Sequence, residues 1–194
     1  MRTYLEKTTA ATGYPVAVSD VKTHSRIVGS SEDTYIQSLI RTAEEHAESY
    51  TGRALLNATY KFYLDRFPPM IVLPKTPLVS LTSIKYIDDD GEEQTLASSR
   101  YKLHNLERPF ILEAHGTNWP STRVDMQAVT VEFVAGYGTG ASDIPEGLRH
   151  ALLFHVAHLF ENREPELLGS IVSSIPNTLE ALLNHWRIWE YHTG

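Results

Sequence analysis

The chain has 194 residues, no cysteine and a formal net charge of −7, from 17 Lys and Arg against 24 Asp and Glu. This length suits one domain or two small ones with a sizeable core, and the lack of cysteine excludes disulfides, Cys-ligated zinc and thiol catalysis. The apolar runs are too short for a membrane span, the N-terminus does not look like a signal peptide, and the acidic charge disfavours coating of DNA through its phosphates.

The N-terminal part of the chain is predicted to be helical after a flexible arm. Residues 1–18 show no clear periodicity, and a short helix is expected from Asp20 to about Arg26. The helix at 32–50 has the clearest pattern of this half, because apolar side chains recur at helical spacing and Gly52 is a natural stop. The opposite face of this helix carries the polar side chains Gln37, Arg41, Glu44, Glu45 and Glu48.

Residues 58–140 are predicted to form an inserted β module. Short segments with a period of two and many aromatic or β-branched residues predict strands at 59–65, 70–73, 79–87, 93–96, 101–104, 109–113 and 128–134. Asp88–Gly91 ends in an Asp-Gly step, which predicts a hairpin turn. A solvated turn also explains the acidic residues there, because the spacing of a calcium-binding loop is missing.

Helical patterns return after a glycine-rich joint at Gly136–Gly140. One helix is expected after Asp143, which is predicted to cap it, and another after Pro176. The sequence therefore predicts an α+β fold, in which a helical part made from both chain ends, residues 19–57 and 141–194, carries the small antiparallel β module between them.

The best candidate for catalysis is a cluster of His155, His158 and Glu161. This spacing places the three side chains on one side of a helix, where a His-dependent metal hydrolase would hold its ion. The helix pattern of zinc proteases is absent, however, and His155 falls in the apolar stripe. A packed helix with a partly buried histidine is therefore the favoured interpretation, and we expect no catalytic residue, metal or cofactor.

The last residues are unusually aromatic for a chain end. The segment His185–Tyr191 combines Trp, Tyr and Arg, the residue types that most often anchor protein interfaces. A terminal helix that packs on its own core explains the same pattern equally well. Trp119, in a loop, leaves the same choice between covering the β core and facing a partner.

The order of several short segments resembles the head–tail adaptor proteins, also called connector or head-completion proteins, of long-tailed bacteriophages and gene transfer agents. The resemblance runs from about Ser19 to Trp189, and no single segment in it is a catalytic signature. The segments are Ser19–His24, Glu48–Ala54, Pro74–Ser80, Ile84–Asp88, Asn118–Pro120, Val131–Gly138, Ile144–Leu148 and His158–Arg163.

This resemblance implies a structural role in the virion neck, between capsid and tail, after assembly in the host cytoplasm. Such adaptors form a ring with copies of themselves, usually a dodecamer, beneath the portal protein. The ring extends the DNA channel and offers a docking surface to a stopper or tail-completion protein. The C-terminal segment commonly engages the portal, which implies the portal-binding residues Leu183, Trp186, Arg187, Trp189, Tyr191 and His192.

The implied partners are therefore the portal, the tail-side protein and other copies of the chain, with no membrane. DNA is expected to pass through the channel without specific binding, because an acidic lumen repels phosphate, and the acidic helix at 32–50 is one candidate lining. A DNA-packaging accessory protein that binds nucleic acid directly is the other alternative. Its basic residues would be Arg100, Lys102, Arg108 and Arg123, which are scattered along the sequence.

Overall fold

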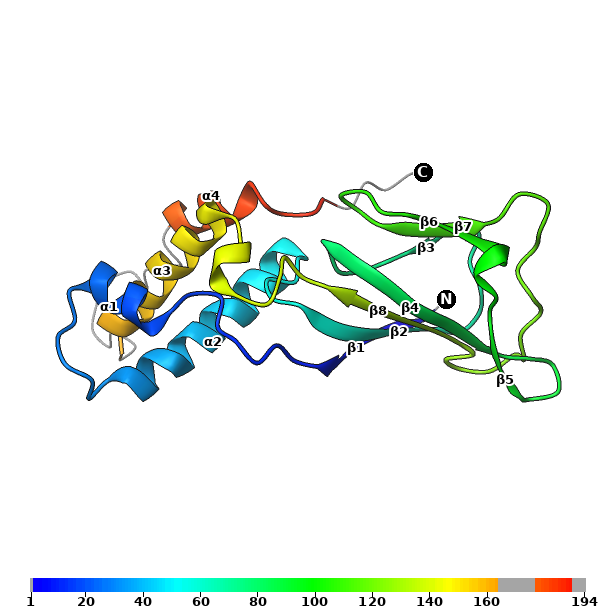
Figure 1. Cartoon of the computed structure of the whole chain (residues 1–194), viewed down its shortest axis with the longest axis horizontal. Helices are drawn as coiled ribbons and strands as arrows, with labels where there is room; N and C mark the ends of the chain where they lie inside the picture. The colour runs from blue at the N-terminus through cyan, green and yellow to red at the C-terminus, as the bar shows by residue number, and fades with distance from the viewer. Residues whose placement is uncertain (1, 164–176, 190–194) are drawn as a thin grey trace, which may run out of the picture. The chain divides into compact units, whose positions relative to one another are not determined.

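The computed structural model describes residues 2–163 and 177–189. The chain folds into two compact units, one made of residues 1–11 and 57–137 and the other of residues 12–56 and 138–194 (Figure 1). The first unit is all β apart from one short turn, and the second is helical. This confirms the predicted α+β class, with a helical part drawn from both ends of the chain and an inserted antiparallel β part.

The strands of the β unit are β1 (Thr3–Thr9), β2 (Ala58–Leu64), β3 (Ile71–Val72), β4 (Leu78–Ile87), β5 (Glu93–Thr95), β6 (Tyr101–His104), β7 (Phe110–Glu113) and β8 (Val129–Ala135). The helices of the other unit are α1 (Val18–Ser25), α2 (Asp33–Thr51), α3 (Glu146–Glu161) and α4 (Asn177–Asn184). Single 3-10 turns lie at Ser98–Arg100 and Ala141–Asp143. No helix within the described ranges is both long and apolar enough to cross a membrane.

The β unit contains two antiparallel sheets, with strand orders β1-β2-β8-β4-β5 and β3-β7-β6. Strands β2 and β8 alternate strictly between buried and half-buried residues. Tyr60 and Phe133 are paired across these two strands, and their rings stack with centroids 5.6 Å apart. Because one face of each strand is apolar, burial of that face in the core of the unit, which also includes Ile71 and Ile111, stabilises the unit.

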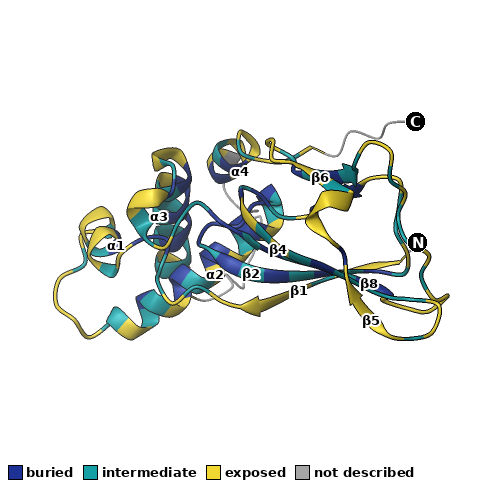
Figure 2. Cartoon of the chain, turned by 45° about the vertical axis from the view of Figure 1, so that its right-hand side comes forward, coloured by how far each residue is buried: buried dark blue, intermediate teal, exposed yellow. Residues whose placement is uncertain are grey.

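The predicted flexible arm at 1–18 is wrong for its first half, because Thr3–Thr9 forms the edge strand β1 against β2. Figure 2 shows this strand exposed along most of its length beside the buried β2. Tyr4 stacks on Tyr63 with ring centroids 6.0 Å apart, and the Tyr63 hydroxyl donates to Glu6 at 2.8 Å. An edge strand with nearly every side chain in solvent has no alternating pattern, so its sequence resembles that of a loop.

Hydrogen exchange tests whether β1 is a strand in solution. An edge strand bonds its neighbour through about every second amide, so we expect slow exchange for alternate residues of Thr3–Thr9 and fast exchange for the others. The measurement is amide exchange by NMR, with the exposed loop around Val28 as the fast reference. Uniformly fast exchange over Thr3–Thr9 would show that this stretch is a flexible arm in solution.

The helical unit is built around the apolar face of α2. The buried apolar residues of this helix are Ile36, Leu39, Ile40, Ala43 and Ala47. They pack with buried positions of α3 and α4, among them Leu152 and Leu183. Gly52 ends α2 with a φ of 74°, a left-handed conformation that glycine adopts without strain.

Two acidic residues that the sequence places on the polar face of α2 are in fact buried. Glu48 accepts a hydrogen bond from the backbone N–H of Leu55 at 2.8 Å. Glu44 pairs with the guanidinium of Arg41 at 2.8 Å. Both carboxylates therefore have the partners that a buried charge requires, and they do not belong to an acidic surface.

The start of the third helix also differs from the prediction. Asp143 does not cap α3, which begins at Glu146. Instead, Asp143 Oδ2 accepts hydrogen bonds from the backbone N–H groups of Thr139 and Gly140, at 2.9 and 3.0 Å. A Cβ atom on Gly138 would overlap the same carboxylate. The C-terminal part of the glycine-rich stretch is thus held by Asp143, and only glycine fits at position 138.

Candidate interaction site at the C-terminal segment

Helix α4 and the residues after it, up to 189, carry most of the residues that the sequence singled out. Helix α4 is amphipathic, and Leu179 and Leu183 are buried with only 1% of each residue exposed. Leu183 is therefore part of the core of the helical unit and anchors the residues after it. We refer to residues 185–189, which continue the chain after α4, as the C-terminal segment.

The C-terminal segment lies against the end of α2 and the start of α3. The guanidinium Nε of Arg53 donates to the backbone carbonyl of Trp186 at 2.6 Å, and its charge lies 6.0 Å from the centre of the indole ring. The indole also lies beside Gly147 in the first turn of α3, where an added Cβ atom would be 3.4 Å from the indole nitrogen. Trp186 is accordingly half-buried, in contact with its own subunit.

A backbone hydrogen bond continues this docking two residues later. The N–H of Ile188 donates to the carbonyl of Thr51 at 2.9 Å. This carbonyl is one of the last of α2, which have no partner inside the helix, so the C-terminal segment satisfies it. The side chain of Ile188 covers Gly52 at the same helix end.

Arg187 and Trp189 lie on the outside of the docked segment. The Arg187 guanidinium lies 5.3 Å from the ring centre of Tyr50 and 4.9 Å from that of Trp189, so it is held between two aromatic faces. Trp189 remains 52% exposed, and Arg187 is exposed as well. Of the six residues proposed for portal binding, these two are available to a partner, and Tyr191 and His192 lie outside the described residues.

Sequence reasoning missed the residues that receive this segment. Arg53, Thr51 and Gly147 belong to helix ends far from the C-terminus in sequence, and only the folded unit brings them together. The one signal in the sequence is Gly147, because glycine in the first turn of a helix often permits the close approach of a bulky side chain.

The candidate metal cluster on α3 does not assemble. His155 is only 5% exposed, and its ring packs edge-on against that of His46 with centroids 4.9 Å apart. His158 instead contacts Asn162 at 3.2 Å. Across residues 2–163 and 177–189, no three potential ligands gather in the way that a metal ion requires.

The pKa of His155 is lowered to about 4, mainly by burial and also by the neighbouring charges of His46 and His158. The imidazole is therefore neutral when folded at neutral pH. A neutral, enclosed histidine is what a packed helix produces, and its Nδ1 has no hydrogen-bond partner among the described residues.

Trp119 packs against other side chains of the β unit. Its ring stacks on Phe67 at a centroid distance of 4.9 Å and an interplanar angle of 4°, and its backbone N–H donates to Glu113 at 2.6 Å. Tyr86 extends the cluster with its ring 5.8 Å from that of Phe67. These contacts fix the long loop between β7 and β8.

Known proteins match this arrangement in sequence and in structure. A model of the phage gp6-like head–tail connector protein family matches residues 16–109. The chain is also similar to a solved chain from the neck of an empty GTA particle, computed with C6 symmetry. The two are 26% identical with a TM-score of 0.80, and the match covers 98% of each chain. The chain is thus similar to head–tail connector proteins, and we refer to it below as the connector.

Two further solved structures match the connector to the same extent. One chain comes from the virion of a native gene transfer agent particle, with 27% identity and a TM-score of 0.80. The other comes from the neck of a native GTA particle computed with C12 symmetry, with 26% identity and a TM-score of 0.77. Both matches cover 98% of the connector and 98% of the other chain. No protein with a curated description matches the connector.

Removal of the Trp186 ring tests the docking of the C-terminal segment. Trp186→Ala should lower the free energy of unfolding by about 1–3 kcal/mol, because it leaves a gap beside Gly147 and Arg53. Trp189→Ala is the matched control and should cost less than about 1 kcal/mol, since that ring is half exposed. Urea unfolding measures both variants, and equal losses would contradict a docked segment.

The acid stability of the connector should depend on His155. The folded pKa of about 4 lies below the ordinary 6.5, so the unfolded state binds more protons between these values. Stability is therefore fully present above about pH 6.5 and is lost as the pH falls towards 4, by about 1–3 kcal/mol from this residue.

Denaturant unfolding at pH 7, 5.5 and 4.5 measures this loss. His155→Gln, which does not titrate in this window, should show a shallower decline with acid than the wild type. Parallel curves for the two proteins would show that His155 ionises equally easily in both states.

Proposed function

We propose that this connector is a structural subunit of a ring in the neck of a tailed phage or gene transfer agent particle, between capsid and tail. In this position it lies beneath the portal, extends the DNA channel and provides the docking surface for a stopper or tail protein. The observation that carries the proposal is the match, over 98% of both chains, to chains from GTA necks and from a GTA virion.

Closure of a ring places requirements on the surface of each subunit. A ring subunit needs two different lateral surfaces, one for each neighbour. The C6 and C12 symmetries of the similar neck structures suit a ring of this connector, with twelve copies as the expected number. With no cysteine, the contacts between copies would depend on packing and polar interactions alone.

The net charge of −7 per subunit suits a channel for DNA, because the charge is repeated around the ring and repels phosphate. The helix at 32–50 contributes less than its sequence suggests, since Glu44 and Glu48 are buried and paired. Exposed acids elsewhere, such as those of the β4–β5 hairpin, would have to supply more of the field.

The exposed pair Arg187 and Trp189 is the part of the C-terminal segment that we propose to contact the portal. Arg and Trp are the residue types that contribute most to interface energies when they are buried. Here Arg187 already lies against the rings of both Tyr50 and Trp189, so less side-chain entropy is lost when a partner covers the pair. Leu183 and Trp186 would hold the segment in place, and Tyr191 and His192 would extend the contact.

Particle assembly tests the role of this pair. The double change Arg187→Ala and Trp189→Ala should leave the fold stable and reduce the yield of tailed particles at least tenfold, which corresponds to about 1.4 kcal/mol of lost contact energy. Infectivity or gene-transfer titre measures the effect, together with the ratio of filled heads to complete particles in micrographs.

The control is Lys102→Ala, which removes an exposed cation from the β unit. Wild-type yield from the double variant would exclude Arg187 and Trp189 as portal contacts. Absence of the connector from purified, complete particles, judged by mass spectrometry, would overturn the neck assignment itself.

A further inference from the structure

Strand β1 forms an open edge of the larger sheet. It is the first strand in the order β1-β2-β8-β4-β5, and β2 is its neighbour. In an antiparallel edge strand, the backbone N–H and C=O groups of alternate residues point away from the neighbouring strand. Six of the seven residues of β1 are exposed and Leu5 is half-buried, so the side chains of this strand lie mostly in solvent.

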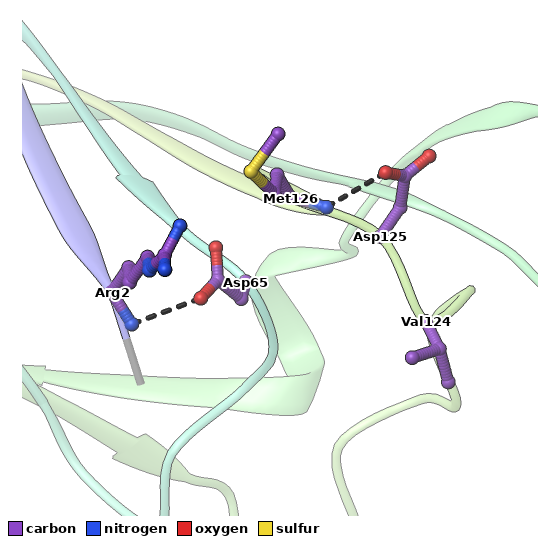
Figure 3. A pocket seen from close by; sticks show the side chains of 5 residues that line it. All are labelled: Arg2, Asp65, Val124, Asp125 and Met126. Atoms are coloured by element: carbon purple, nitrogen blue, oxygen red, sulfur yellow. Dashed lines mark hydrogen bonds between the residues drawn. The ribbon is translucent and has the colours of Figure 1, made fainter.

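This open edge is ordered, because hydrogen bonds hold both ends of β1. The backbone N–H of Arg2 donates to Oδ2 of Asp65, directly after the end of β2, at 2.9 Å (Figure 3). Oδ1 of Asp65 accepts the N–H of Gln127 at 3.3 Å, and these two backbone bonds lower the pKa of the carboxyl. At the other end, the hydroxyl of Thr8 donates to the carbonyl of Thr59 at 3.2 Å. A strand that is already fixed loses little backbone entropy when a further strand pairs with it.

The two edges of this sheet differ in how strongly they resist pairing. At the opposite edge, β5 has only three residues, and the pairing of β4 with β8 is irregular at two places between Leu78 and Ser83. Short strands and bulges both blunt an edge. Strand β1 has one irregularity, between Lys7 and Thr9, so the stretch Thr3–Lys7 pairs regularly with β2. The regular part of β1 is therefore the edge that is better suited to a further strand.

We propose that the free connector forms a two-fold dimer, in which β1 pairs antiparallel with β1 of a second copy. The register that we infer places Tyr4 opposite Tyr4 of the second copy, and Arg2 of each copy opposite Glu6 of the other. Because alternate residues point outward, residues that face each other across the new pair must differ by an even number of positions, and positions 2 and 6 meet this condition.

The side chains of β1 favour this register over the neighbouring ones. It forms two pairs of opposite charge on either side of a tyrosine pair, and both kinds of cross-strand pair stabilise antiparallel strands. It would also cover the ring of Tyr4, which is 57% exposed. A register centred on Leu5 would place Arg2 and Glu6 opposite uncharged residues. Registers centred on Glu6 or Lys7 would place two like charges opposite each other.

The charges of β1 also indicate which partner it takes. Arg2 and Glu6 lie at equal distances on either side of Tyr4 in the sequence, so an antiparallel copy of the same strand complements both charges. An unrelated strand has no reason to carry opposite charges at these two positions. The self-complementarity of β1 therefore favours a second copy of this chain over another protein.

The dimer would be a state of the connector before it enters the neck, a point that rests on the function proposed above. In an isologous contact the same patch serves both copies, so the contact closes at two copies. A ring subunit instead needs two different lateral surfaces. The pairing through β1 would therefore have to open when the ring forms.

Sedimentation of the isolated protein tests the pairing. A monomer–dimer equilibrium is expected, and Glu6→Arg should raise the dissociation constant at least tenfold, because it places like charges opposite each other. Arg2→Glu should have the same effect. The double variant with both changes restores the opposite charges and should dissociate within about threefold of the wild type, whereas Lys102→Glu, the control in β6, should change nothing. A protein that stays monomeric up to about 1 mM, or a double variant without rescue, would overturn the proposal.

A disulfide tests the register. Because the chain has no cysteine, Tyr4→Cys introduces a single thiol. Residues directly opposite each other in an antiparallel pair have Cα atoms about 4.5–5.5 Å apart, which a disulfide can bridge. Mild oxidation should therefore link two copies at position 4, as seen on non-reducing gels. The control is Thr8→Cys, exposed on the same strand but far from its own copy in this register. Equal linking of both variants, or no linking at position 4, would contradict the inferred register.

Hydrogen exchange provides a readout in the wild-type protein. In dilute protein, the outward amides of β1 should exchange fast, as at any open edge. Those within Thr3–Leu5 should exchange more slowly as the protein concentration rises, because the second copy then covers them. Exchange that does not depend on concentration would rule out the dimer. None of these measurements uses particles, so absence of the connector from purified particles would overturn the proposed function and leave the dimer standing.

Discussion

The helical unit depends on the burial of one face of α2. Helices α1, α3 and α4 all contact this helix, although they come from both ends of the sequence. The stabilising energy comes from apolar area removed from water, and the two buried glutamates are tolerated because each has a partner. The C-terminal end of the same helix then provides Thr51 and Arg53, which hold the C-terminal segment. The position and orientation of the exposed Arg187 and Trp189 thus depend on the packing of α2, which begins more than a hundred residues earlier in the sequence.

The parts of the fold that the sequence predicted are those in which one face of an element is buried. Helix α2 and strands β2 and β8 each have a periodic apolar pattern, because only one side of each meets the core. Strand β1 was not predicted, because its side chains are almost all exposed and its stability comes from backbone pairing with β2. The sequence wrongly predicted Glu44 and Glu48 to be exposed, because a periodicity analysis counts every glutamate as polar. Their burial depends on partners that only the folded chain provides, namely Arg41 for Glu44 and the N–H of Leu55 for Glu48.

The C-terminal segment could also be predicted only in part. The aromatic composition of the C-terminus predicts either a contact with a partner or packing on its own core, and composition alone cannot distinguish the two. The structure divides it, with Leu183 and Trp186 turned to their own unit and Trp189 left half exposed.

The interleaving of the two units affects how the chain folds as it leaves the ribosome. Helix α2 is complete at Thr51, yet its main covering helix α3 begins only at Glu146. Between these points the ribosome delivers every strand from β2 to β8, so the β unit has all of its sequence first. Domains fold as units during synthesis, and transiently exposed apolar surface promotes aggregation. The apolar stripe of α2 therefore stays exposed until α3 has been synthesised. Its dense set of flanking charges would serve to keep the nascent protein in solution until the last helices emerge.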